Sequence, residues 1–259
     1  MKKAVKYILY SILAIVLLGC MIVAYIAGQE SRKPIMCKSI VIEILDSTEN
    51  SFVTAVDVRK FIDRSCGKII GQQIDSIDLD KVENAIDSRS AVLKSQAYVT
   101  RDSILNIKVT QRKPVVRFQK KDGGFYADAE GYIFPLQSSY ASHVQIIDGE
   151  IPLAANSGYK GDIADPEEKA WFKKVMKVVN YMENSKVWKG KIVQIHVDKK
   201  GELTLVPRVG NEVFLFGQPD SIEDKFLKME KYYTTILPEK GSSKYKTIDV
   251  RFEGQIVCK

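Results

Sequence analysis

The sequence is poor in the residues that most often carry out chemistry. It holds two histidines and four cysteines in 259 residues, and no two cysteines have the C-x-x-C spacing of a zinc or thioredoxin-type site. It also lacks a G-x-S-x-G elbow, a Walker loop, an H-E-x-x-H motif and a G-x-G-x-x-G turn after a predicted strand. His143 and His196 lie far apart, and strand alternation directs His196 to solvent. We therefore expect no enzyme, no catalytic residue, no cofactor and no metal.

A strongly basic stripe is also missing. The net charge is +7, and Lys2, Lys3 and Lys6 supply three of these charges near the N-terminus. In the rest of the chain, lysines and acids are interleaved, whereas a nucleic-acid-binding protein gathers its positive charge on one face or arm. We expect no nucleic-acid partner.

A segment without charge stands near the N-terminus. Residues 8–27 read ILYSILAIVLLGCMIVAYIA. A helix of this length spans about 30 Å, which matches the hydrocarbon core of a bilayer. A cleaved signal peptide is one alternative, but its apolar region would be shorter. A lipoprotein is another, because Leu17-Leu18-Gly19-Cys20 resembles a lipoprotein box with Cys20 as the lipidated residue, although the sequence stays apolar beyond it. We predict an uncleaved transmembrane helix over 8–28.

The charges around this segment predict its orientation. Lysines favour the cytoplasmic side of a membrane helix, so we expect residues 1–7 to form a cytoplasmic tail. Residues 29–37 then form a linker to a folded region outside the cytoplasm. Composition and Pro114, which cannot donate to a strand ladder, divide this region into units over 38–113 and 114–259.

Three cysteines lie outside the apolar segment: Cys37, Cys66 and Cys258. Their odd number leaves at least one thiol unpaired within the chain. A Cys37–Cys66 disulfide and unpaired, partly buried thiols are both open, and the second fits the count better.

The first unit alternates between strand and helix patterns. In chain order we predict a strand over 39–45, a helix capped by Thr54, a helix over 78–88, and a hairpin of strands 96–100 and 103–110. Asp57 completes an acidic capping box with Thr54. Alternation puts Leu105, Ile107 and Val109 on the buried face. Two helices can cover one face of a three-stranded sheet, so a small α+β unit is expected.

The second unit is predicted to be a mixed β domain with two amphipathic helices. The helices begin at Asp165 and Ser221, and Asp128-Ala129-Glu130-Gly131 forms a hairpin turn. The expected strands are 124–127, 132–136, 144–147, 191–197, 202–206, 212–216 and 245–252, the last of which can continue through Ile256 and Val257. The fold class is α+β.

Three motifs, in this order, resemble the FtsQ/DivIB family of bacterial cell-division proteins. Gln111-Arg112-Lys113-Pro114 stands where the sheet of that family's POTRA domain ends. The segment 125–134, FYADAEGYIF, resembles the family's D-x-x-G hairpin, and 248–252, IDVRF, resembles its closing D-[LV]-R-[FY] strand. The unit over 38–113 accordingly resembles a POTRA domain.

The resemblance implies a non-catalytic scaffold of the divisome, anchored in the inner (plasma) membrane at the division septum. It implies that the POTRA-like unit contacts other septal proteins. It also implies that the last strand pairs with an FtsB-type subunit, which is itself coiled with an FtsL-type subunit. Such pairing satisfies the free N–H and C=O groups of a terminal edge strand. The partner-binding residues carried over by position are Arg251, Phe252, Gly254, Ile256 and Lys199.

Two other readings of the sequence predict different features. Another POTRA-bearing envelope protein, involved in export or outer-membrane assembly, would have a repeated POTRA unit or a barrel-like tail. An envelope enzyme or sensor would need a convergent polar pocket. The sequence offers neither pattern, and the short segment 1–7 leaves little room for cytoplasmic contacts.

Overall fold

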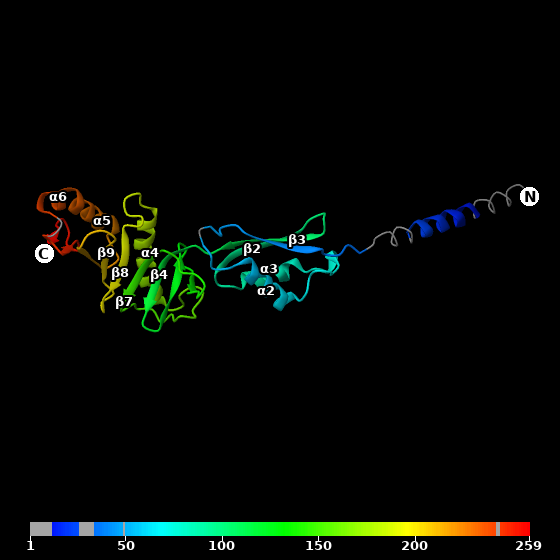
Figure 1. Cartoon of the computed structure of the whole chain (residues 1–259), viewed down its shortest axis with the longest axis horizontal. Coiled ribbons are helices and arrows are strands. Elements are labelled where there is room, and N and C mark those ends of the chain that lie inside the picture. The colour runs from blue at the N-terminus through cyan, green and yellow to red at the C-terminus, as the bar shows by residue number, and fades with distance from the viewer. Residues whose placement is uncertain (1–11, 26–33, 49, 242–243) are drawn as a thin grey trace, which may run out of the picture.

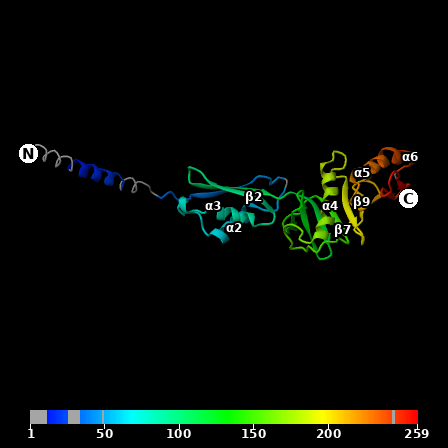
Figure 2. The ribbon, with the colours of Figure 1, turned by 180° about the vertical axis from the view of Figure 1, so that it is seen from behind.

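The computed structural model describes residues 12–25, 34–48, 50–241 and 244–259. Two units lie end to end along the long axis, one built on a three-stranded sheet and one on a nine-stranded sheet (Figure 1). The reverse view shows the same order, with the C-terminus at the end of the large unit farthest from the small one (Figure 2). The mixture of helices with parallel and antiparallel strands confirms the predicted α+β class.

Residues 12–25 form a helix whose side chains are all exposed. Its large apolar residues include Ile15, Met21 and Val23, each at least 67% exposed. No helix in the described ranges is long and apolar enough to cross a membrane. Both ends of the predicted segment 8–28 lie outside the described residues. The predicted tail 1–7 and most of the predicted linker 29–37 also lie outside them.

The small unit contains three strands and two α-helices. In chain order these are β1 (Ser39–Ile44), α2 (Ala55–Cys66), a 3₁₀ turn (Ile74–Ser76), α3 (Leu79–Asp87), β2 (Val92–Val99) and β3 (Ile104–Gln111). The strand order is β1-β3-β2, with β1 parallel and β2 antiparallel to β3. Both helices pack on the same face of this sheet (Figure 1).

Local sequence signals explain how these elements begin and which face they bury. The Thr54 hydroxyl accepts a hydrogen bond from the Asp57 amide at 3.2 Å, and the Asp57 carboxylate accepts one from the Thr54 amide at 3.2 Å, so the predicted capping box is confirmed. Leu105, Ile107 and Val109 are at most 1% exposed, as alternation predicts. The Cys37 thiol is buried and the Cys66 thiol is half-buried, and neither forms a disulfide.

The large unit contains the remaining strands and helices. They are β4 (Pro114–Lys120), β5 (Gly123–Asp128), β6 (Ile133–Pro135), β7 (Gln145–Gly149), α4 (Pro166–Asn184), β8 (Ile192–Val197), β9 (Leu203–Pro207), β10 (Val213–Gly217), α5 (Ile222–Lys231), a π-helical turn (Tyr232–Ile236), α6 (Leu237–Lys240), β11 (Thr247–Asp249) and β12 (Val257–Cys258). The strand order is β12-β11-β10-β9-β8-β7-β4-β5-β6. The short strand β12 is therefore the last strand at one end of the sheet.

One face of the large sheet carries the core. Helices α4 and α5 lie side by side on it, and the rings of Tyr181 and Phe226 stack with centroids 4.8 Å apart. Asp165 caps α4 through bonds from the amides of Glu167 and Glu168, as its sequence predicts. The opposite face stays partly open, with Ile146 still 38% exposed. The helices thus cover one face, and in the described part of the chain no strand pairs with the outer side of β12.

Gln111 and Phe52 join the two units. The buried Gln111 amide accepts a hydrogen bond from the Val53 N–H at 2.8 Å and donates one to the Asn50 carbonyl at 2.8 Å. These bonds hold the loop that carries Phe52. The Phe52 ring then packs edge-on against Tyr126 and Phe134 of the large unit, at centroid distances of 5.5 and 5.8 Å. The two units therefore share one hydrophobic cluster.

Arg112 adds a polar contact to this junction. Its guanidinium lies 2.8 Å from the Asp128 carboxylate and 3.5 Å above the Tyr132 ring. Although Arg112 opposes it, burial raises the pKa of Asp128 above its usual range. Gly131 closes the Asp128 turn with φ = 87°, the left-handed conformation expected of a glycine there.

The sequence-based prediction of the strands was wrong in two places. It included no strand over Pro114–Lys120, which forms β4; the pairing with β5 shifts register between Pro114 and Val116, so the ladder tolerates the proline. It also expected one long strand over 245–252. The observed strand β11 ends at Asp249, the chain turns, and β12 returns antiparallel to β11.

We expect Leu105→Ala to lower the free energy of unfolding by about 3 kcal/mol, because it leaves a cavity in the core of the small unit. Lys108→Ala changes the solvent-facing side of the same strand, and its 3.9 Å contact with Glu43 is exposed, so its effect should stay within about 0.5 kcal/mol. Denaturant unfolding measures both. Equal losses in the two variants would contradict the assignment of the buried face.

Candidate partner-binding edge

The terminal strand β12 has backbone groups available for pairing. Thr247 and Lys259 exchange two backbone hydrogen bonds, of 3.0 and 2.9 Å. Directly opposed residues alternate in an antiparallel ladder, so the neighbouring pair Ile248–Cys258 is not hydrogen-bonded. The N–H and C=O of Cys258 therefore point away from β11, toward the open side. An extended peptide can form main-chain hydrogen bonds with such groups at the edge of a sheet.

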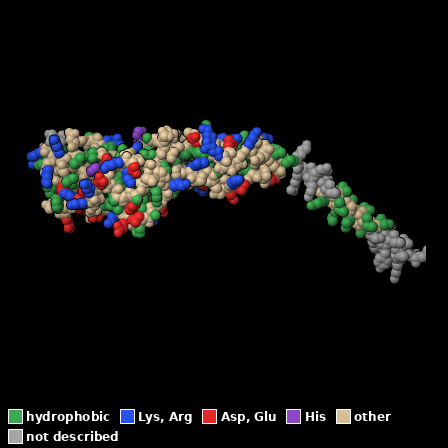
Figure 3. Space-filling view, turned by 90° about the horizontal axis from the view of Figure 1, so that it is seen from below, with side chains coloured by type: hydrophobic (Ala, Val, Ile, Leu, Met, Phe, Trp, Pro, Cys, Tyr) green, Lys and Arg blue, Asp and Glu red, His purple; other side chains and the backbone are tan. Residues whose placement is uncertain are grey.

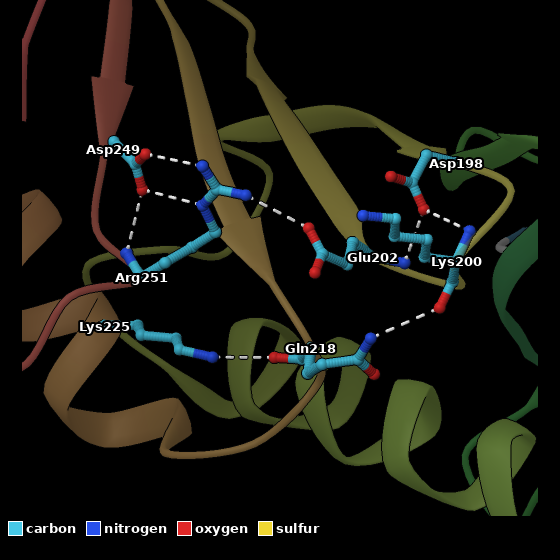
Figure 4. Close-up of polar contacts among 7 residues, drawn as sticks. All are labelled: Asp198, Lys200, Glu202, Gln218, Lys225, Asp249 and Arg251. Carbon is cyan, nitrogen blue, oxygen red and sulfur yellow. Dashed lines mark hydrogen bonds and ion pairs between the residues drawn. The ribbon is translucent and has the colours of Figure 1, made fainter.

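Hydrogen bonds between the Asp249 carboxylate and the Arg251 guanidinium hold the chain where β11 ends (Figure 4). Arg251 Nε and Nη2 donate to the two Asp249 oxygens at 2.9 and 2.8 Å, and Nη1 donates to Glu202 at 3.1 Å. The Arg251 hydrogen bonds hold the pKa of Asp249 below its usual value of 3.8. The same pairing raises the pKa of Arg251. The end of β11 is thereby attached to the start of β9.

The turn between β11 and β12 carries Arg251 and three further predicted partner-binding residues. Phe252 is 46% exposed, so it does not belong to the core. Gly254 has φ = 69°, which favours glycine in this turn. Ile256 is half-buried and packs against the core cluster. The structure brings these residues together with Arg251 at one end of the sheet.

Lys199 lies in the turn between β8 and β9 and is exposed. The Asp198 carboxylate organises this turn by accepting bonds from the amides of Lys200 and Glu202. Gln218 donates to the Lys200 carbonyl at 3.2 Å, and Glu202, just after the turn, binds Arg251 (Figure 4). The turn that carries Lys199 is thus part of the same polar network as the C-terminal segment.

Two lysines lie at the end of this edge. The Lys246 amide donates to the Lys259 carbonyl at 2.7 Å, so the two residues are neighbours at the end of the ladder. Both side chains are exposed. Over the face shown in Figure 3, basic and acidic side chains are interspersed. The end of the edge therefore carries two exposed positive charges.

Sequence reasoning selected Arg251 but missed the residues that hold it. Asp249 and Arg251 are two positions apart, and in an extended segment this spacing puts both side chains on one face. That signal could have predicted the Asp249–Arg251 pair. Glu202 could not have been found in this way, because 49 residues separate it from Arg251.

One histidine of the described residues pairs with a carboxylate. His196 is exposed, as expected, and its Nδ1 lies 2.9 Å from Asp148, which also accepts a bond from Gln194 at 2.7 Å. No group of three metal-ligating side chains occurs in the described ranges. The site chemistry is that of backbone pairing and charge.

Comparison with protein families agrees with this geometry. Residues 113–259 match the family model described as FtsQ/DivIB, C-terminal related, and this match covers more than half of the chain. The chain belongs to the FtsQ/DivIB family. Residues 35–110 of this family member match the model of a POTRA-like domain, which confirms the resemblance of the small unit. The comparison with curated proteins gave no match.

Membership in the FtsQ/DivIB family defines the general role of the chain. The family consists of non-enzymatic cell-division scaffold proteins, so a role as a scaffold in cell division follows. The edge described above lies within the part of the chain that matches the family's C-terminal model.

The lowered pKa of Asp249 gives the Asp249–Arg251 pair a definite pH dependence. A carboxyl group whose folded pKa is depressed stabilises the fold above its unfolded pKa, and this stabilisation is lost as the pH falls toward the folded pKa. In Arg251→Gln, the free energy of unfolding should therefore fall less steeply as the pH is lowered from above the unfolded pKa of Asp249 through its folded pKa. Chemical denaturation at a series of pH values measures the slope.

Arg208→Gln is the matched control for this measurement. Arg208 Nε donates to the Gly190 carbonyl, which does not titrate. Its replacement should leave the pH slope unchanged. An Arg251→Gln slope identical to that of the unaltered chain would contradict the Asp249 assignment.

Proposed function

We propose that this chain is a non-catalytic, single-pass membrane scaffold of the bacterial divisome that holds an FtsB-type subunit by strand addition to β12. The FtsL-type subunit joins through its coiled coil with the FtsB-type subunit. The observation that carries the proposal is the position of β12: it is the terminal strand of the nine-stranded sheet, and the Cys258 N–H and C=O face away from β11.

Strand addition fits the physical character of this edge. An added strand gains main-chain hydrogen bonds with Cys258, and side chains at alternate positions supply specificity. Phe252 is exposed in the turn that leads to β12 and offers a large aromatic surface for the partner, as aromatic residues do at the centres of interfaces. Gly254 and Ile256 belong to the same turn.

The charges favour a partner strand that carries acids. Lys246, Lys259 and Lys199 are exposed, and none forms an ion pair with the described residues. An edge lysine also discourages pairing with apolar strands, which limits unwanted association. Arg251 keeps capacity for a partner as well, because its guanidinium has more N–H donors than the three used by Asp249 and Glu202.

The N-terminal segment supports the membrane anchor in this proposal. The helix over 12–25 exposes apolar side chains around its circumference, including Ile15, Val16 and Met21, and a helix that is apolar all round is typical of a membrane or a buried position. The uncharged sequence extends from 8 to 27. Residues 8–28 then anchor the chain in the plasma membrane, with 1–7 in the cytoplasm and the POTRA-like unit exported to contact other septal proteins.

Cys258→Pro tests strand addition directly. Proline removes the outward N–H of the edge and is tolerated where that N–H faces solvent. We expect the full chain to fold normally. Its affinity for the FtsB-type subunit of the same organism should fall by at least about tenfold, because the bond donated by the Cys258 N–H and the adjacent bond of the ladder are lost. Co-purification and titration of the two proteins measure this.

Cys258→Ala is the control, since it changes the same side chain and keeps the N–H. Burial raises the pKa of the Cys258 thiol, so the thiol itself has little thiolate character to lose. The alanine variant should bind as the unaltered chain does. Retained binding by a folded Cys258→Pro variant would overturn strand addition at β12.

Depletion tests the division role independently of the binding surface. Cells from which the chain is depleted should grow as filaments with unfinished septa, because a scaffold that assembles the septum is absent. Microscopy of cell length and septum number after depletion measures this, and re-expression of the chain is the control. Normal cell length throughout depletion would count against a role in division.

A further inference from the structure

Lys228 of helix α5 is buried, and its ammonium group contacts the segment that leads to β12. The Lys228 side chain is 8% exposed. Its Nζ lies 2.7 Å from the Phe252 carbonyl oxygen, 3.4 Å from the Val250 carbonyl oxygen and 2.5 Å from the Asp224 carboxylate. An ammonium group has three donors, and these three acceptors satisfy all of them.

The segment held by Lys228 has little backbone bonding of its own. The Val250 amide donates to the Leu215 carbonyl at 3.2 Å. From 251 to 256, no backbone–backbone hydrogen bond is found within the described part of the chain. Arg251 is held through its side chain by Asp249 and Glu202, on the β9 side. Lys228 is the corresponding attachment to α5, and it acts on the main chain itself.

We propose that Lys228 is a positioning residue for the partner-binding edge: it fixes the carbonyl groups of Val250 and Phe252 so that the chain reverses and β12 returns onto β11. This inference rests on the proposed function, because it assigns Lys228 an effect on partner binding without contact to the partner. An edge that is already ordered loses less conformational entropy when a strand is added, so ordering by Lys228 favours binding.

Lys225 provides a matched control on the same helix. Its side chain is 6% exposed. Its Nζ lies 2.7 Å from the Gln218 carbonyl oxygen (Figure 4) and 2.6 Å from the Asp220 carboxylate. It therefore holds the loop between β10 and α5, and none of its hydrogen bonds reaches residues 250–259. Lys225→Met and Lys228→Met remove the same charge from equally buried positions.

Hydrogen exchange of the full chain in detergent tests the positioning role without any partner. In Lys228→Met, the amides of Lys246, Thr247 and Lys259 should exchange at least about tenfold faster, because charged hydrogen bonds that keep the turn closed are lost. The core amides of β8 and β9 should keep their protection. In Lys225→Met, the three edge amides should exchange as in the unaltered chain. Unchanged exchange in Lys228→Met, or an equal increase in Lys225→Met, would overturn the proposal.

Binding of the purified FtsB-type subunit from the same organism gives the second measurement. Lys228→Met should raise the dissociation constant by about tenfold or more, whereas Lys225→Met should leave it within about twofold. Faster edge exchange with unchanged binding would overturn the role in partner binding. If the unaltered chain itself does not bind this subunit, the proposed function fails, and the exchange measurement alone still decides whether Lys228 orders the edge.

Discussion

Burial of a single face of the nine-stranded sheet is the constraint on which the large unit depends. Strands β4, β8, β9 and β10 direct fully buried side chains toward α4 and α5, which pack together through Tyr181 and Phe226. Because both helices lie on this face, neither covers the hydrogen-bonding edge of the sheet. The sheet can therefore end in a strand that is supported from one side and open along its border.

The path of the chain through β11 and β12 depends mostly on side-chain contacts. Strands β11 and β12 have only three and two residues, too few for a ladder to define the path of the chain by itself. Arg251 attaches this path to β9 through Glu202, and Lys228 attaches it to α5 through main-chain carbonyls. A buried cation is costly unless its donors are satisfied, so the buried Lys228 restricts the segment to a narrow set of conformations. A short edge with lysines beside it also resists indiscriminate strand pairing.

Side-chain contacts at the junction attach the POTRA-like unit to the large unit. Phe52 packs between aromatic rings of the large unit, and Arg112 binds Asp128 in the first hairpin of that unit. Both contacts connect the POTRA-like unit to strands β5 and β6, at the end of the sheet opposite β12. For a scaffold, this arrangement separates the surface of the small unit from the proposed partner-binding edge by the full width of the sheet.

Features that depend on neighbouring residues could be predicted from the sequence. Thr54 and Asp57 form their capping box within one helical turn, alternation buries Leu105, and the Gly131 turn needs no distant contact. The path of the C-terminus, in contrast, depends on contacts between segments that are far apart in the sequence. The pattern of 245–252 favours a continuous strand, but Lys228 and Glu202, 24 and 49 residues from their partners, hold the chain in a reversal. Such contacts form only after the helices and strands have packed, so no local pattern could reveal them.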